Sequence, residues 1–145
     1  MNSEGFVRTI IVEAPSLTDN TADAQRLEKS LQRTLDADHI RIPLTILKNL
    51  PSNLRAWGFK AKVVLFKNRY SWIVVDLLNP ISDRPVLGAA IDIGTTRIVM
   101  SLVNLETGDE ISEKGFDNPQ ATIGPDVLAR IHYSKEKTGL AELNH

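Results

Sequence analysis

The residues of this sequence that could carry chemistry are gathered in one short run, Asp92-Ile93-Gly94-Thr95-Thr96, at the end of an apolar stretch. A glycine followed by two threonines is typical of a tight turn, whose backbone N–H and hydroxyl groups can donate hydrogen bonds to phosphate oxygens. A carboxylate two residues before the glycine is placed to hold Mg²⁺ through water, because Mg²⁺ gives up its water ligands reluctantly. We therefore predict a phosphate-binding turn at Gly94, Thr95 and Thr96, with Asp92 as the magnesium ligand.

The flanking sequence bears on whether this run is a binding site or an ordinary turn with satisfied polar groups. Apolar, strand-like residues precede it at 86–93 and follow it at 97–105, and a second turn, Leu105-Glu106-Thr107-Gly108, comes next. This arrangement resembles the first phosphate loop of the superfamily that contains actin, sugar and acetate kinases and the large heat-shock chaperones. The resemblance implies ATP and Mg²⁺ as ligands and the opening of a ribonuclease-H-like subdomain.

Composition describes an ordinary globular chain and excludes several kinds of site. The 145 residues are 42% hydrophobic and 24% charged with a formal net charge of −1, so no nucleic-acid or membrane surface is indicated. Without cysteine, the chain cannot supply a disulfide, a thiol nucleophile or the ligands of a Cys-bound iron–sulfur cluster. The lack of a signal-peptide pattern and of an apolar run near ~20 residues leads us to expect a cytoplasmic protein.

Two domains with a linker between them are indicated by turn residues and by charge. We place the boundaries at 1–80, 81–86 and 87–145, because prolines and turn formers gather at 79–85. Residues 1–85 carry 12 Lys and Arg against 9 Asp and Glu, whereas residues 86–145 carry 5 against 9. The sign of the net charge therefore reverses at the predicted linker.

The first domain is predicted to be a small α+β unit of one strand, three helices and a hairpin. A β-branched run at 7–13 predicts the strand, and leucines at helical spacing after a cap at Asn20 predict a helix that ends at 36–38. Prolines predict two short helices at 43–49 and 51–57, and strand-like runs at 60–66 and 70–77 predict the hairpin. Four aromatic residues are predicted to lie in the core: Trp57, Phe59, Phe66 and Trp72.

The second domain is predicted to begin with strands at 86–93 and 97–105 and a short third strand at 110–114. Gly124-Pro125-Asp126 then predicts the start of a helix that runs to Ile131, because proline suits the first helical turn and an acid suits the positive end of the helix.

Beyond the turn, three stretches together resemble one family, the ATP-dependent reductive activators of corrinoid proteins. The stretches are Asp92-Ile93-Gly94-Thr95-Thr96, Leu105-Glu106-Thr107-Gly108, and Asn118-Pro119-Gln120 followed by Gly124-Pro125-Asp126-Val127-Leu128-Ala129-Arg130-Ile131. The resemblance is strong over 86–132. Over 8–80 it depends more on the general residue pattern than on specific motifs. It implies that residues 1–80 are the middle domain of such an activator. Residues 87–145 are then the first hairpin, third strand and helix of its actin/sugar-kinase-type ATPase domain, which is incomplete here.

Members of that family use ATP and the iron–sulfur cluster of a ferredoxin domain to return the corrinoid of a methyltransferase protein from Co(II) to Co(I). By this resemblance we expect a fragment of such an activator whose ferredoxin domain is absent, with a corrinoid protein as the partner of the parent protein. We expect no catalytic residue in the fragment, no hydrolysis of ATP by it alone, and self-association through the incompletely covered sheet.

Two other interpretations stay open from the residues. The chain could be a non-catalytic dimerisation or interaction module, or part of another kinase-like ATPase such as a sugar kinase. The run from Asn118 to Ile131 and the α+β unit before it argue against the sugar-kinase interpretation.

Overall fold

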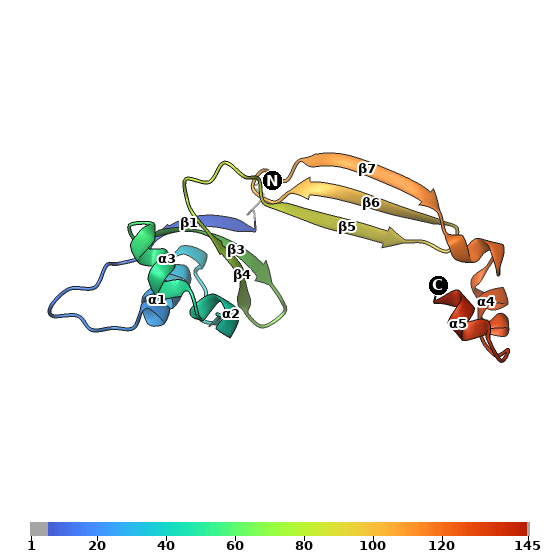
Figure 1. The fold of residues 1–145 in the computed structure, drawn as a ribbon, viewed down its shortest axis with the longest axis horizontal. Helices are drawn as coiled ribbons and strands as arrows, with labels where there is room; N and C mark the ends of the chain where they lie inside the picture. Colours follow the sequence, from blue (N-terminus) through green and yellow to red (C-terminus); the bar gives the residue numbers. More distant parts are fainter. Residues whose placement is uncertain (1–5, 145) are drawn as a thin grey trace. The chain divides into compact units, whose positions relative to one another are not determined.

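The chain is a mixed α+β protein, as predicted, and its computed structural model describes residues 6–144. It divides into two compact units. Unit 1 comprises Met1–Val86 with Leu105–Thr107, and unit 2 comprises Leu87–Asn104 with Gly108–His145. Each unit has its own sheet, and we describe each by itself (Figure 1).

The sheet of unit 1 has four strands, β1 (Val7–Ile11), β2 (Ile40–Arg41), β3 (Lys60–Lys67) and β4 (Trp72–Leu78). They lie in the order β1-β3-β4-β2, with β3 antiparallel to both β1 and β4 and with β2 parallel to β4. The predicted first strand and hairpin are present. The two-residue strand β2 was not predicted, because two residues are too few to show a periodicity.

Three helices, α1 (Asp23–Leu35), α2 (Leu44–Leu47) and α3 (Leu50–Ala56), accompany this sheet. Leu27 and Leu31 of α1 and Leu54 of α3 are fully buried against it. One apolar cluster joins the helices to the sheet: Ile10, Val12, Leu27, Leu31, Leu50, Leu54, Ala61, Val63, Leu65, Trp72, Val74 and Leu77. Unit 1 therefore has a continuous core.

Two details of unit 1 differ from the predictions. Helix α1 begins after Ala22 and not after Asn20, and Ala22 makes no side-chain cap hydrogen bond. Phe66 was predicted to lie in the core but is 50% exposed. Leu65 takes the inward position on β3, and successive side chains of a strand point to opposite faces, so Phe66 faces outward.

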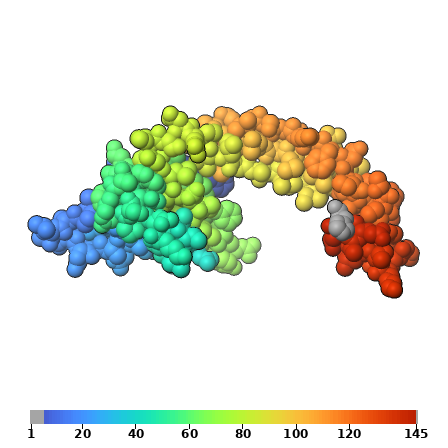
Figure 2. Space-filling model, in the orientation of Figure 1, coloured from blue at the N-terminus to red at the C-terminus, as the bar shows by residue number. Residues whose placement is uncertain are grey.

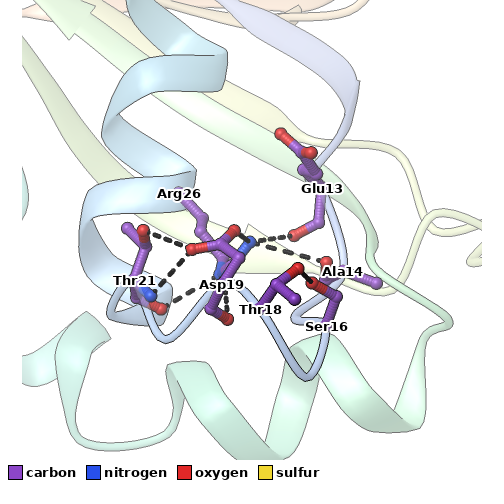
Figure 3. Close-up of polar contacts among 7 residues, drawn as sticks. All are labelled: Glu13, Ala14, Ser16, Thr18, Asp19, Thr21 and Arg26. Atoms are coloured by element: carbon purple, nitrogen blue, oxygen red, sulfur yellow. Dashed lines mark hydrogen bonds and ion pairs between the residues drawn. The ribbon is translucent and has the colours of Figure 1, made fainter.

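Arg26 of α1 holds the loop that precedes the helix (Figure 3). Its side chain is 3% exposed; it donates to the carbonyl oxygens of Thr21 and Asp19, at 3.0 Å each, and pairs with the Asp19 carboxylate at 2.7 Å. The Thr21 hydroxyl and N–H also donate to Asp19, and together with Arg26 they lower the pKa of Asp19 from 3.8 to about 2. A buried guanidinium with these partners replaces the missing helix cap as the anchor of the loop.

The sheet of unit 2 is an antiparallel meander of β5 (Leu87–Ile93), β6 (Arg97–Asn104) and β7 (Glu110–Asp117). The third strand is longer than predicted by three residues. The turn before it contains Gly108 at φ 81°, a conformation that suits glycine.

Short helices follow β7: the 3₁₀-helix η1 (Pro119–Thr122), then α4 (Val127–Tyr133) and α5 (Gly139–Leu143). Helix α4 lies where a helix was predicted, but it begins later: Asp126 is its N-cap and Pro125 precedes it, whereas proline was predicted in the first turn. The helices η1 and α5 were not predicted. Tyr133 donates its hydroxyl to Glu142, which raises the pKa of Tyr133 and lowers that of Glu142 and so connects α4 to α5.

Most of the large apolar residues of this second sheet lie on one face, and several of them are exposed. By the strand register, Leu87, Ala89, Ile91 and Ile93 share this face with Ile98, Met100, Leu102 and Phe116. Ile91 is 54% exposed and Ile93 74% exposed. Within unit 2, α4 and α5 lie beyond the end of the strands (Figure 1), and Figure 2 shows strand residues at the surface with no helix over them. Within residues 6–144, unit 2 therefore has no buried apolar cluster comparable with that of unit 1.

Among residues 6–144, no helix is both long and apolar enough to cross a bilayer.

We expect the Asp19 carboxylate to give unit 1 a stabilisation that acid removes. Because the pKa of Asp19 is about 2 in the folded chain and 3.8 ordinarily, its contribution is complete above about pH 4 and is lost as the pH falls towards 2. Asp19→Asn should unfold more easily than wild type at pH 6, with a difference that shrinks steadily between pH 4 and pH 2. Urea titrations across this range measure it.

Asp83→Asn is the matched control, because it removes the same charge from an exposed residue. A pH-independent gap between Asp19→Asn and wild type would contradict the assignment of the ion pair.

Candidate phosphate-binding site

The turn between β5 and β6 is a two-residue hairpin turn with Thr95 and Thr96 at its centre. The N–H of Gly94 donates to the Arg97 carbonyl at 3.0 Å and closes the turn. A Cβ on residue 94 would lie 2.6 Å from that carbonyl oxygen, so the backbones approach too closely for any side chain there. The glycine is therefore required by this contact, a reason that sequence reasoning did not give.

Three successive carbonyl oxygens of the turn are hydrogen-bonded by the segment that follows β7. The Asn118 side-chain amide donates to Gly94 O at 2.8 Å, and the Asn118 backbone N–H donates to Thr96 O at 2.8 Å. The Arg130 guanidinium donates to Thr95 O at 2.5 Å. Each carbonyl is thus directed towards Asn118 or Arg130.

This arrangement leaves the N–H groups of the turn free to meet an anion. In a trans peptide the N–H points opposite to the carbonyl of the preceding residue. The N–H of Thr95 therefore points away from Asn118, and the N–H of Thr96 points away from Arg130. Within residues 6–144, neither these N–H groups nor the two threonine hydroxyls have a hydrogen-bond partner. A set of such donors is what a phosphate oxygen needs.

Asn118 and Arg130 are themselves held in place. Asn118 is 5% exposed, and its side-chain oxygen accepts from the Gln120 N–H at 2.9 Å, which caps η1. Arg130, on α4, also donates to the Gly124 carbonyl at 2.8 Å and to the Gln120 side chain at 3.3 Å. The helices after the sheet thus position the turn through two fixed side chains.

Sequence reasoning gave no role to Asn118 or Arg130, although both lie in the stretches that carried the resemblance. An asparagine before a proline is a signal for a capped turn. No comparable signal marks Arg130, because its contact with Thr95 is 35 residues away in sequence.

Asp92 is the second-last residue of β5 and lies opposite Val99. It is exposed, and within the described residues its carboxylate has no hydrogen bond or ion pair. In residues 6–144 no group of three or more His, Cys, Asp and Glu side chains is arranged to hold a metal ion. A single free carboxylate beside phosphate donors still suits Mg²⁺, which binds through one or two carboxylates, water and substrate phosphates.

A hollow of about 270 Å³ lies on the other face of the same hairpin. It is lined by Ile93, Ile98, Asn118, Pro119, Gln120, Leu143 and Asn144. By the strand register, Ile93 and Ile98 lie on the apolar face, whereas Asp92 lies on the opposite one. The hollow is therefore separate from the predicted magnesium position.

Two family models together match almost the whole chain. The family model described as the RACo linker region matches residues 1–80, and the model of the RACo middle region matches residues 87–145. These names differ from the middle domain and ATPase domain that we expected for the two stretches.

Two similar proteins have descriptions that name the activation of corrinoids or corrinoid proteins. The chain is 28% identical over 118 residues to the corrinoid activation enzyme RamQ of Eubacterium limosum, which covers 80% of this chain and 18% of that protein. A solved structure of a reductive activator for corrinoid, iron-sulfur protein is 29% identical with a TM-score of 0.82, and the match covers 97% of this chain and 23% of that one. The chain thus spans less than a quarter of either relative.

We expect Asn118→Asp to loosen the turn. The new carboxylate keeps the acceptor for Gln120 but faces the Gly94 carbonyl oxygen with a second oxygen in place of a donor. Losing a buried hydrogen bond in this way costs about 1–3 kcal/mol. Amide hydrogen exchange at Gly94, whose N–H closes the turn, should accelerate about tenfold or more.

Asn79→Asp is the matched control, because the side-chain oxygen of Asn79 accepts from the Ile81 N–H in an exposed turn and needs no donor. Equal exchange at Gly94 in both variants would show that Asn118 does not hold the turn.

Proposed function

This chain belongs to the RACo family, and from that premise we propose that it contributes the nucleotide-phosphate site of an activator that reduces a corrinoid protein with the help of ATP. The family membership confirms the resemblance seen in the sequence. The observation that carries the proposal is the turn at 94–96, whose carbonyl groups are bound on one side and whose N–H and hydroxyl groups are unpaired within residues 6–144.

The residues fit a magnesium-bound nucleoside triphosphate. The N–H and hydroxyl groups of Thr95 and Thr96 bind phosphate oxygens, and the Asp92 carboxylate orients Mg²⁺ through its water ligands. When bound, the metal neutralises charge on the phosphates and polarises the bond that is cleaved. The work of Gly94 is structural, since it permits the close backbone contact that shapes the turn.

In this proposal unit 2 is the start of an ATPase domain of the actin and sugar-kinase type, with further strands and loops supplied by other residues of the activator. Hydrolysis requires groups that clamp the nucleotide from the opposite side, because a single turn cannot exclude water or orient the attacking molecule. We accordingly place no catalytic residue in these 145 positions.

The redox step involves groups outside this sequence. With no cysteine, the residues present do not fit an iron–sulfur cluster, so we derive no electron transfer through this chain. We propose that a ferredoxin domain of the whole activator carries the electron that takes the partner's corrinoid from Co(II) to Co(I). Unit 1 then serves as the connecting domain, and unit 2 reports the nucleotide state to it.

We predict that Asp92→Asn, in a full-length activator that carries this sequence, lowers ATP hydrolysis in the presence of the corrinoid protein by about a hundredfold or more. The asparagine has nearly the same size but no charge to hold Mg²⁺. Phosphate release measures the rate, and the melting temperature checks the fold.

Glu110→Gln, at the far end of β7, is the control that removes an acidic charge from the same sheet. If Asp92→Asn and Glu110→Gln hydrolyse ATP at the same rate, Asp92 has no part in the reaction.

A second role, self-association, is favoured by the exposed apolar face of unit 2. The face contains Ile91 and Ile93, and both β5 and β7 are edge strands of the three-stranded sheet. Covering a few hundred Å² of it, at ~25 cal/mol per Å², gives several kcal/mol. We propose that this face is buried against a second copy when the chain is alone, since an exposed apolar sheet face is a site of association.

We predict a dimer or larger species in sedimentation velocity at about 100 µM, converted to monomer by Ile91→Glu. A charge on the apolar face is costly to bury, because it loses its water shell. Ala90→Glu places the same charge one residue away on the opposite face and should leave the association unchanged. A wild-type monomer at this concentration, or equal behaviour of the two variants, would refute the association through this face.

A further inference from the structure

Arg97 is fixed by its backbone at the exit of the phosphate-binding turn. It is the first residue of β6, and its carbonyl oxygen accepts the hydrogen bond from Gly94 that closes the turn. Its Cα therefore cannot move without opening the turn. The side chain of Arg97 starts directly beside Thr96, one of the two residues with unpaired donors.

The side chain of Arg97 lies across the neighbouring strand, over Gly115. A Cβ on residue 115 would be 2.5 Å from Nη2, 2.7 Å from Nε and 2.9 Å from Cζ of Arg97. All three distances are shorter than van der Waals contact, so the guanidinium occupies the space that a side chain at 115 would fill. The lack of a side chain at Gly115 thus leaves room for the guanidinium to lie over β7.

This position puts the guanidinium on the same face of the hairpin as the Asp92 carboxylate. Asp92 lies opposite Val99 on β6, and Arg97 is two residues from Val99, so all three share a face. Asp92 and Arg97 therefore project from the same face of the hairpin near its turn, Asp92 from β5 and Arg97 from β6.

Within residues 6–144 the Arg97 guanidinium has no hydrogen bond or ion pair. Its cross-strand neighbour Asp117 forms none with it. Arg130 differs, because its guanidinium N–H groups donate hydrogen bonds to Thr95, Gly124 and Gln120. Arg130 shapes the turn, whereas the donors of Arg97 remain available.

We propose that Arg97 binds the terminal phosphates of the nucleotide held at the turn, as a residue that sets affinity for polyphosphate. The proposal rests on the proposed function and adds a contact to it. Guanidinium groups bind phosphate oxygens in pairs, through two parallel N–H donors, and stay charged at any physiological pH. A triphosphate with Mg²⁺ keeps a net negative charge, which the cation offsets.

The test is a titration of the ¹⁵N-labelled 145-residue chain with MgATP and, separately, with magnesium tripolyphosphate. In wild type the amide signals of Thr95 and Thr96 should shift with both probes. Arg97→Gln should weaken both by about tenfold, as expected for a lost charge-assisted hydrogen bond. Arg97→Lys should weaken binding less than Arg97→Gln does, because lysine keeps the positive charge but lacks the two parallel N–H donors of the guanidinium.

Lys114→Gln is the control, since Lys114 adjoins Gly115 but lies on the opposite face, across from Met100. The proposal is overturned if Arg97→Gln binds both probes as tightly as Lys114→Gln does, while the proposed function stands. It is overturned equally if Arg97→Gln weakens MgATP but not tripolyphosphate, because the contact is then to adenosine. Wild type whose Thr95 and Thr96 signals respond to neither probe would overturn the phosphate site itself.

Discussion

The carbonyl oxygens of Gly94, Thr95 and Thr96 are all turned towards the segment that follows β7, and the candidate site depends on this constraint. A peptide group has one donor and one acceptor at opposite ends, so binding the acceptors on one side fixes the direction of the donors. Buried Asn118 binds two of the three carbonyls, which makes the turn rigid before any ligand arrives. A rigid donor set binds an anion without first losing entropy to order itself.

The two units use their apolar residues differently. In unit 1 the leucines of α1 and α3 and the valines of β3 form one buried cluster, so the unit has what a stable small domain requires. In unit 2 an apolar sheet face stays partly exposed, although its strands pair along their length with one register shift between Leu102 and Val103. Hydrogen bonding along the strands therefore shapes unit 2, while the burial that usually stabilises a sheet must come from another surface.

Much of the fold could be predicted from the sequence, because local patterns decide it. A β-branched run marked β1, apolar runs marked β5 and β6, leucine spacing marked α1, and Gly124-Pro125-Asp126 marked the start of α4. The elements that sequence reasoning missed depend on distant partners. Strand β2 exists because Ile40 and Arg41 pair in parallel with β4, some 32 residues later, and Arg26 replaces a helix cap that no local signal provides. The turn itself was predicted, but its two supporting side chains were not, since their contacts form only in the folded chain.

The bond from Arg130 to Thr95 has a mechanical consequence for the helix that carries it. Arg130 lies on α4, and this hydrogen bond is direct and 2.5 Å long. A displacement of α4 by more than about 1 Å away from the turn exceeds hydrogen-bonding distance, and the peptide between Thr95 and Thr96 is then free to rotate. Anion binding at the turn and the position of α4 are for this reason thermodynamically linked: a ligand that favours the inward carbonyl also favours the docked helix, and a partner that pulls the helix lowers the affinity for the ligand.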